Sequence, residues 1–303
     1  MRLAFALLAT ALLLTPVAGG GSSPPLPREA IVVPTGAAPC GAAFRAGSGS
    51  LWVGVYETGT LLHVADERVA ARIRIGPTPC RVAVGPAAVW VTLDRPGEVV
   101  RVSLGSGRRK RIRVGTGAFD VLLASGSAWA TSFEVGTIAK IDPVTARVTR
   151  VFRDGANPAG LASCGGHIWV GHGRAATWLT SIDPSTHRLR RLDVGTKSPG
   201  WPRCVFGQLW VTTPKAVLKI DARSGKVLAR LRLGGTPAEA AAGPDGLVWI
   251  TDKERSVVHR VDPAGRTVVD SFAAGPGAFA LARAGDSMWV TSFAGADVRR
   301  YER

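Results

Sequence analysis

The feature that most constrains the fold is a tryptophan that recurs at nearly regular spacing. Seven of the nine tryptophans lie between aliphatic or small residues, and the intervals between them are 38, 39, 40, 41, 39 and 40 residues. They are Trp52, Trp90, Trp129, Trp169, Trp210, Trp249 and Trp289. A repeat of this length, made of short alternating segments, is typical of propeller blades with four strands each. The sequence therefore predicts seven blades.

The composition agrees with an all-β chain. The 303 residues include 37 glycines and 20 prolines, which favours many short strands and tight turns over long helices. Apolar residues make up 46% and charged residues 20%, so the chain can bury a large core. A collagen, a coiled coil and a polytopic membrane protein are excluded.

Each repeat can be divided into four strands. A small, apolar inner strand, such as residues 81–84, precedes the tryptophan strand, and a polar loop leads to a third strand, such as residues 138–141. A turn that begins with aspartate follows, and the fourth strand alternates arginine with an aliphatic residue. In this order, the loops between the second and third strands share one face with the blade junctions. The aspartate turns lie on the opposite face.

The two ends of the chain predict how the ring closes. After Trp289 the chain runs only to Arg303, which leaves room for a third strand but not for a fourth. Residues 30–36 have the pattern of the fourth strand of a blade, but they come ahead of the first repeat, where no blade precedes them. We expect this strand to complete the last blade, which removes the open joint of the ring. The prediction is an all-β, seven-bladed β-propeller over residues 30–303.

The first residues have the pattern of a secretory signal peptide. Arg2 precedes an apolar run over residues 3–14, and small residues follow up to Gly20. The run is short for a membrane span, although a retained anchor stays an alternative. We predict a signal peptide over residues 1–20, a flexible leader over residues 21–29 and export to a secreted or periplasmic location.

Export makes the four cysteines expected disulfide partners. Cys40 and Cys80 occupy corresponding positions in the first two blades, and Cys164 and Cys204 do so in the fourth and fifth. Of the three possible connectivities, this spacing selects Cys40–Cys80 and Cys164–Cys204. A zinc site is the alternative, but the sequence has no C-x-x-C pair.

One blade carries a resemblance to a known group of propellers. Residues 243–251 (GPDGLVWIT), followed by Val261-Asp262-Pro263, resemble the YVTN-type and streptogramin (virginiamycin B) lyase-like propellers. The lyases of this group imply a divalent metal held by a Glu-x-His pair ahead of a W-F-T-E strand. Here Asp252 is the only acid at the last position of that strand, and neither of the last two blades contains Glu-x-His. We therefore predict no catalytic residues, no metal ligands and no cofactor.

Two classes of function remain. The first is an exported, non-catalytic propeller that binds a small ligand or a protein partner at the channel mouth. The second is a metal-dependent lyase or lactonase-like enzyme of the streptogramin-lyase type, with a degenerate or relocated active site. Only the family resemblance favours the second.

The predicted binding site gathers the varied loops and blade junctions of one face. Mixed charges with aromatic side chains around a channel mouth are typical of recognition sites, and loops on a rigid scaffold are where function concentrates. Any one of these residues could simply be a solvated loop position, so the prediction concerns the group. It comprises Tyr56, Glu57, Arg81, Asp94, Arg95, Phe119, Phe133, Glu134, His172, Arg174, Trp201, Asp252, Phe279 and Phe293.

The charge of the chain is strongly basic. There are 31 arginines and 7 lysines, the net charge is +16, and most of the excess lies on outer strands and their turns. Charged outer strands resist edge-to-edge pairing, which is the plainer explanation. Contact with an anionic envelope surface is the alternative. Export and the lack of interleaved aromatic and basic residues argue against nucleic acid. We expect a monomer whose partner is an unknown small molecule or a cell-envelope protein.

Overall fold

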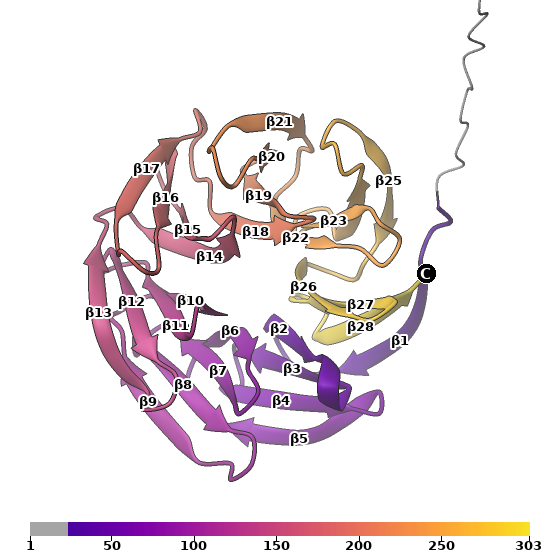
Figure 1. Cartoon of the computed structure of the whole chain (residues 1–303). Coiled ribbons are helices and arrows are strands. Elements are labelled where there is room, and N and C mark those ends of the chain that lie inside the picture. Colours follow the sequence, from indigo (N-terminus) through magenta and orange to yellow (C-terminus); the bar gives the residue numbers. More distant parts are fainter. Residues whose placement is uncertain (1–23) are drawn as a thin grey trace, which may run out of the picture.

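The computed structural model describes residues 24–303, so the predicted signal peptide lies outside the described residues. Seven four-stranded antiparallel sheets stand around a central axis as the blades of a propeller (Figure 1). The predicted all-β, seven-bladed architecture is confirmed. Within the described part, the one helix is a short 3-10 turn, η1 (Ala46–Ser48).

The blades follow one another along the chain. The first three consist of β2 (Pro39–Arg45), β3 (Ser50–Val55), β4 (Thr60–Ala65) and β5 (Arg68–Arg74); β6 (Pro79–Val84), β7 (Ala88–Leu93), β8 (Glu98–Ser103) and β9 (Arg109–Arg113); and β10 (Ala118–Ala124), β11 (Ser127–Ser132), β12 (Thr137–Asp142) and β13 (Arg147–Arg153). The next three consist of β14 (Pro158–Cys164), β15 (His167–His172), β16 (Trp178–Ile182) and β17 (Leu189–Asp193); β18 (Trp201–Val205), β19 (Gln208–Thr213), β20 (Ala216–Ile220) and β21 (Val227–Arg232); and β22 (Pro237–Ala242), β23 (Val248–Asp252), β24 (Val257–Val261) and β25 (Val268–Ala273).

The seventh blade closes the ring with strands from both ends of the chain. It consists of β26 (Ala278–Ala284), β27 (Ser287–Ser292), β28 (Asp297–Glu302) and β1 (Arg28–Pro34). Strand β1 pairs antiparallel with β28, from Arg28 opposite Glu302 to Pro34 opposite Asp297. The predicted closure by the N-terminal strand is confirmed. Strand β1 begins at Arg28, two residues before the predicted start.

The repeated tryptophans fill the spaces between blades. Trp90 of the second blade packs against Val121, Ala128 and Ala130 of the third. Trp249 of the sixth blade packs in the same way against residues of the seventh. Because each indole buries on the order of 150–250 Å² when enclosed, the lattice supplies much of the core.

Both predicted disulfides are present. Cys40–Cys80 joins the first and second blades and Cys164–Cys204 joins the fourth and fifth, with Cα–Cα distances of 4.9 and 5.3 Å. Glycine lets these blades approach closely, because a Cβ atom on Gly171 would lie 2.3 Å from the carbonyl oxygen of Gly200. Disulfides are typical of proteins outside the cytoplasm. In residues 24–303, none of the helices has the length and apolar character needed to cross a membrane.

The two faces of the propeller differ as the strand order predicts. Backbone hydrogen bonds tie second-to-third-strand loops to blade junctions, from Tyr56 N–H to Ala38 O (2.9 Å) and from Phe133 N–H to Gly117 O (2.7 Å). We call this side the mouth face. The opposite side, the turn face, carries the aspartate turns, where Asp142 Oδ1 accepts from the backbone N–H groups of Val144 and Thr145 at 2.9 and 2.7 Å.

Candidate functional site: the central channel and its mouth

Six of the predicted aromatic side chains form a continuous series across the mouth face. The series runs Phe133, Phe119, Trp201, Phe279, Phe293 and Tyr56, with successive ring centroids 5.2, 5.0, 5.8, 6.1 and 6.5 Å apart. All six side chains are half-buried. Below, this set is called the aromatic series. Its residues come from blades that are distant in sequence, and the ring architecture brings them to one place.

Two positions of the blade supply most of these rings. Trp201 is the first residue of the inner strand β18, and Phe119 and Phe279 are the second residues of β10 and β26. Phe133 and Phe293 directly follow the tryptophan strands β11 and β27. Since the inner strands start at the mouth face and the tryptophan strands end there, both positions point rings toward the channel opening.

Cationic side chains lie against the aromatic series. The Lys253 ammonium is 4.2 Å from the ring centroid of Phe293 and 5.4 Å from that of Phe279. The Arg174 guanidinium is 5.4 Å from the centroid of Phe133 and forms an ion pair with Glu134 at 3.1 Å. These cation–π contacts hold positive charge at the edge of an apolar surface.

The remaining exposed predicted residues lie around the first two blades. Tyr56 donates its hydroxyl to Asp94 Oδ2 at 3.0 Å, and burial together with this carboxylate raises the pKa of Tyr56. Glu57 and Arg95 line a separate cavity of about 410 Å³. The structure therefore places Glu57, Asp94 and Arg95 beside Tyr56, at one end of the aromatic series.

Three predicted residues are buried: Arg81, which lies in the channel and is described below, and His172 and Asp252. His172 is 0% exposed, and its Nε2 lies 3.1 Å from both Asp154 Oδ2 and Thr180 Oγ1. Asp252 is likewise 0% exposed. Both side chains are held inside their blades, which corrects the expectation that they lie in the open mouth.

The residues present do not fit the divalent metal that the resemblance implies. Asp252 Oδ1 already accepts three backbone N–H groups, and Oδ2 lies 3.4 Å from His259 Nε2. Burial alone would raise the pKa of Asp252, but the backbone hydrogen bonds from Arg255 and Thr236, together with His259, outweigh it and the pKa is lowered. Within residues 24–303, no three side chains of the metal-binding types converge. We derive no step through a metal.

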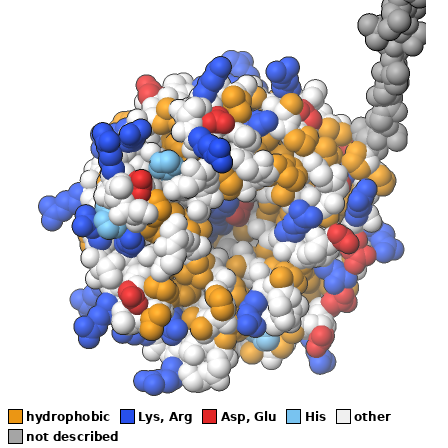
Figure 2. Space-filling view, viewed as in Figure 1, with side chains coloured by type: hydrophobic (Ala, Val, Ile, Leu, Met, Phe, Trp, Pro, Cys, Tyr) orange, Lys and Arg blue, Asp and Glu red, His pale blue; other side chains and the backbone are white. Residues whose placement is uncertain are grey.

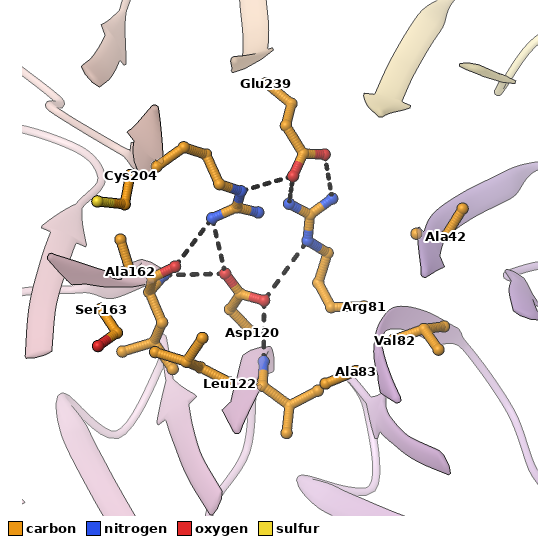
Figure 3. Close-up of a pocket in the computed structure, with 14 residues that line it drawn as sticks. Ala42, Arg81, Val82, Ala83, Asp120, Leu122, Ala162, Ser163, Cys204 and Glu239 are labelled. Atoms are coloured by element: carbon orange, nitrogen blue, oxygen red, sulfur yellow. Dashed lines mark hydrogen bonds and ion pairs between the residues drawn. The ribbon is translucent and has the colours of Figure 1, made fainter. Parts of the chain in front are cut away.

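Beneath the aromatic series, four charged side chains meet across the channel (Figure 3). Arg81 forms ion pairs with Glu239 at 3.1 Å and with Asp120 at 3.5 Å. Arg203 does the same, at 2.6 Å to Glu239 and 3.4 Å to Asp120. We call these four residues the ionic layer. It joins the second, third, fifth and sixth blades, and Figure 2 shows charged side chains on the floor of the central hollow.

The ionic layer is held by its neighbours above and around it. The Arg81 guanidinium lies 4.7 Å from the Trp201 ring centroid, which couples the layer to the aromatic series. Each Asp120 oxygen accepts a backbone N–H at 2.9 Å, from Val121 and from Leu161 of the next blade. These bonds fix the carboxylate while leaving the guanidinium groups to span the channel.

Burial governs the protonation of the layer. Removal from water raises the pKa of Asp120 to about 6, although Arg81 and the backbone donors act in the other direction. Burial also raises the pKa of Glu239. For Arg81, burial alone would lower the pKa, but the carboxylates of Glu239 and Asp120 outweigh it and the pKa is raised. Arg81 therefore keeps its charge, and Asp120 changes its charge near pH 6.

Sequence reasoning selected Arg81 for the mouth and missed Arg203 and Glu239 as site residues. A signal for Glu239 exists in the strand register. Arg81, Asp120 and Glu239 each stand two residues before the partner of the blade tryptophan on the inner strand. Three other blades have Gly41, Gly160 and Ala280 at that position, and the fifth has Trp201. Charge at a position that is uncharged in the other blades indicates a polar layer inside the channel.

The comparisons with known proteins concern the fold. Virginiamycin B lyase from Staphylococcus aureus, in a catalytically inactive variant solved with quinupristin, superposes with a TM-score of 0.80 at 13% identity, over 92% of this chain and 99% of that one. The chain has the fold of the streptogramin B lyases. Hydrazine synthase from Kuenenia stuttgartiensis is similar at a TM-score of 0.77 and 15% identity, over 95% and 99% of the two chains.

A third solved structure widens the range of functions found on this fold. BamB from Moraxella catarrhalis gives a TM-score of 0.65 at 12% identity, over 88% of this chain and 85% of that one. No family model and no curated protein matches the sequence. At such low identities the likeness establishes architecture alone, because one fold hosts many functions.

Proposed function

We propose that this protein is an exported, non-catalytic binding protein that holds a small ligand or a protein partner at the mouth of its channel. The aromatic series is the observation that carries the proposal. Six half-buried rings gathered on one face form an apolar surface rimmed by charge, and such surfaces on soluble proteins mark interaction sites. The two disulfides and the signal-like N-terminus support export.

The geometry indicates how a ligand would be held. A cavity of about 350 Å³ is lined by Phe119, Phe133 and Trp201, and its lining also includes Lys215 and Glu254. A planar apolar group can stack on the rings, at about 0.5–1.5 kcal/mol per ring beyond the effect of buried area. The charged residues then orient the polar part of the ligand.

The proposal favours binding over lyase chemistry. The metal donors that the lyase resemblance implies do not converge in residues 24–303, and the acid at the matching position is engaged by backbone donors. The only observation that supports an enzyme is the likeness of the fold to the lyases. Quinupristin, the compound named with the similar lyase, is therefore a useful member of any ligand panel.

The experiment is a thermal-shift panel of aromatic and aliphatic compounds, including indole-3-acetate and quinupristin, followed by titration of each stabilising compound. Trp201→Ala should weaken binding at least tenfold because Trp201 is at the centre of the series. The matched control is Phe206→Ala, since Phe206 is 48% exposed in the turn between β18 and β19 on the turn face. Equal binding by Trp201→Ala and loss in Phe206→Ala would overturn the proposal. Cleavage of quinupristin by protein supplied with Mg²⁺ would establish the lyase instead.

A further inference from the structure

A second cavity lies in the channel on the other side of the ionic layer from the aromatic series. It has a volume of about 300 Å³ and is lined mainly by small and aliphatic side chains, among them Val82, Ala83, Leu122, Ala162 and Ser163. Val82, Ala83 and Leu122 come after Arg81 or Asp120 along their inner strands. Ala162 and Ser163 come after Gly160, which occupies the matching position in the fourth blade. Because every inner strand runs from the mouth face toward the turn face, this cavity belongs to the turn-face half of the channel.

The ionic layer presents one guanidinium nitrogen without a well-aligned hydrogen-bond acceptor. Arg81 Nη2 is buried and makes no hydrogen bond within the described chain, although it lies 3.1 Å from Glu239 Oε1. Arg203 Nε donates to the same oxygen at 2.6 Å. Two cations therefore converge on one carboxylate oxygen. A buried charged donor without an acceptor is costly, and an oxygen of a bound molecule would remove that cost.

We propose that this part of the channel is a binding site for a small aliphatic carboxylate, separate from the mouth. The carboxylate would accept hydrogen bonds from the guanidinium groups of Arg81 and Arg203, whose planar geometry matches such a group. The aliphatic part would lie against the apolar lining, of which Leu122 and Ala162 are members. The site goes beyond the proposed function at the mouth and does not depend on it.

The charge of the whole chain favours an anion over a cation. Two arginines and two ionised carboxylates leave the ionic layer without net charge, and the chain as a whole carries +16, which attracts anions. The groups that face Asp120 are Arg81, Arg203 and Glu239. With a pKa of about 6, Asp120 loses its charge in mildly acidic solution and the layer becomes cationic. Binding should then be tighter at pH 5.5 than at pH 7.5.

The test is calorimetric titration of the exported protein with sodium butyrate. One butyrate per chain should bind, at least threefold more tightly at pH 5.5 than at pH 7.5, and neutral butyramide should bind at least tenfold more weakly. Arg203→Gln should weaken butyrate binding at least tenfold. Arg232→Gln is the matched control, because Arg232 is exposed on the outer strand of the same blade and loses the same charge.

A second variant tests the cavity without altering charge. Ser163 lines the cavity with an exposed side chain, so Ser163→Phe should fill the space and abolish butyrate binding while the fold is kept. The proposal is overturned by absent butyrate binding, by equal binding of butyramide or by unchanged binding in Ser163→Phe. Binding of inorganic phosphate in preference to butyrate would overturn the carboxylate assignment. Because the probes and variants differ from those used at the mouth, either proposal can fail alone.

Discussion

At the scale of single residues, the ionic layer shows how burial sets chemistry. The side chains of Arg81 and Asp120 are each 5% exposed, whereas the arginines of outer strands such as β9 and β13 are exposed to water. Replacing one member would leave an opposite charge buried without its partner, which costs more than an exposed pair gains. The layer is therefore the place where a single substitution has the largest electrostatic effect.

The raised pKa of Asp120 predicts a pH dependence of stability. Its pKa is about 6 in the folded chain and about 3.9 in an unfolded one, so the folded state binds the proton more tightly. The protonation of Asp120 therefore adds to the free energy of unfolding. This stabilisation is complete below about pH 4 and is lost as the pH rises through about 6. Between pH 5 and pH 7.5 it amounts to on the order of 1 kcal/mol.

Asp120→Asn removes this titration. The difference in the free energy of unfolding between the native chain and the variant should be larger at pH 5 than at pH 7.5, as measured by urea unfolding with the disulfides intact. Asp142→Asn is the control, because backbone hydrogen bonds lower the pKa of this exposed turn residue and it stays ionised over that range. An Asp120→Asn difference that is equal at both pH values would contradict the assigned pKa.

At the scale of strands and blades, the two disulfides join blades that already approach closely. A Cβ atom on Gly54 would lie 2.5 Å from the carbonyl oxygen of Cys80, and Gly171 has the same relation to Gly200. Each disulfide therefore joins blades whose backbones are already in contact. Because it adds little to the folded state, its effect on stability should come mainly from restricting the unfolded chain.

Removing one cross-link should lower stability without changing the fold. Cys164→Ala combined with Cys204→Ala opens a loop closed over a separation of 40 residues, which the chain-entropy model values at about 4 kcal/mol. Urea unfolding of the double variant and the native chain measures the difference. Peptide mapping without reduction should find Cys40 linked to Cys80 in both. Equal stability, or four free thiols in the native chain, would show that the bond is not formed.

The elements also show which parts of the site the sequence could predict. An indole in every blade has one structural role, so the lattice was sufficient to place strands, faces and disulfides. The position three residues after each tryptophan does not predict exposure, because it holds residues as different as Val55, His172 and Asp252, and all are buried. The strand pleat turns this last residue inward in every blade. His172 and Asp252 were predicted as site residues because of their residue types. Their exposure, however, is determined by their position in the repeated blade.

The ionic layer was harder to predict for a geometric reason. Most inner strands contain a register shift near their start, which the sequence does not display. Strand β18 pairs without that shift, so Arg203 stands directly opposite Trp210 rather than at the position of Arg81. Three of the four charges share a register position and the fourth does not. The four charged side chains contact one another because they are long enough to reach across the channel. An alignment of the repeats carries no information about these distances.

At the scale of the whole molecule, closure of the ring depends on a few residues at its two ends. Glu29 of β1 accepts from Arg299 at 2.9 Å and from the Tyr301 hydroxyl at 3.0 Å. Just ahead of β1, the carbonyl oxygens of Pro24 and Pro25 accept from the buried Arg260 guanidinium at 2.8 and 2.7 Å. The start of the described chain thus fastens both the seventh and the sixth blades.

Deleting this segment should open the ring. A chain that begins at Gly36 lacks β1, so β28 keeps an unpaired edge and Arg260 loses two carbonyl acceptors. An unpaired edge strand is a template for association with another copy. We expect a lower thermal midpoint and concentration-dependent oligomers, measured by light scattering after size exclusion. A chain that begins at Pro24 is the control and should remain monomeric with the native midpoint. If the chain beginning at Gly36 is monomeric and equally stable, the ring is held by its tryptophan-packed blades without the terminal strand.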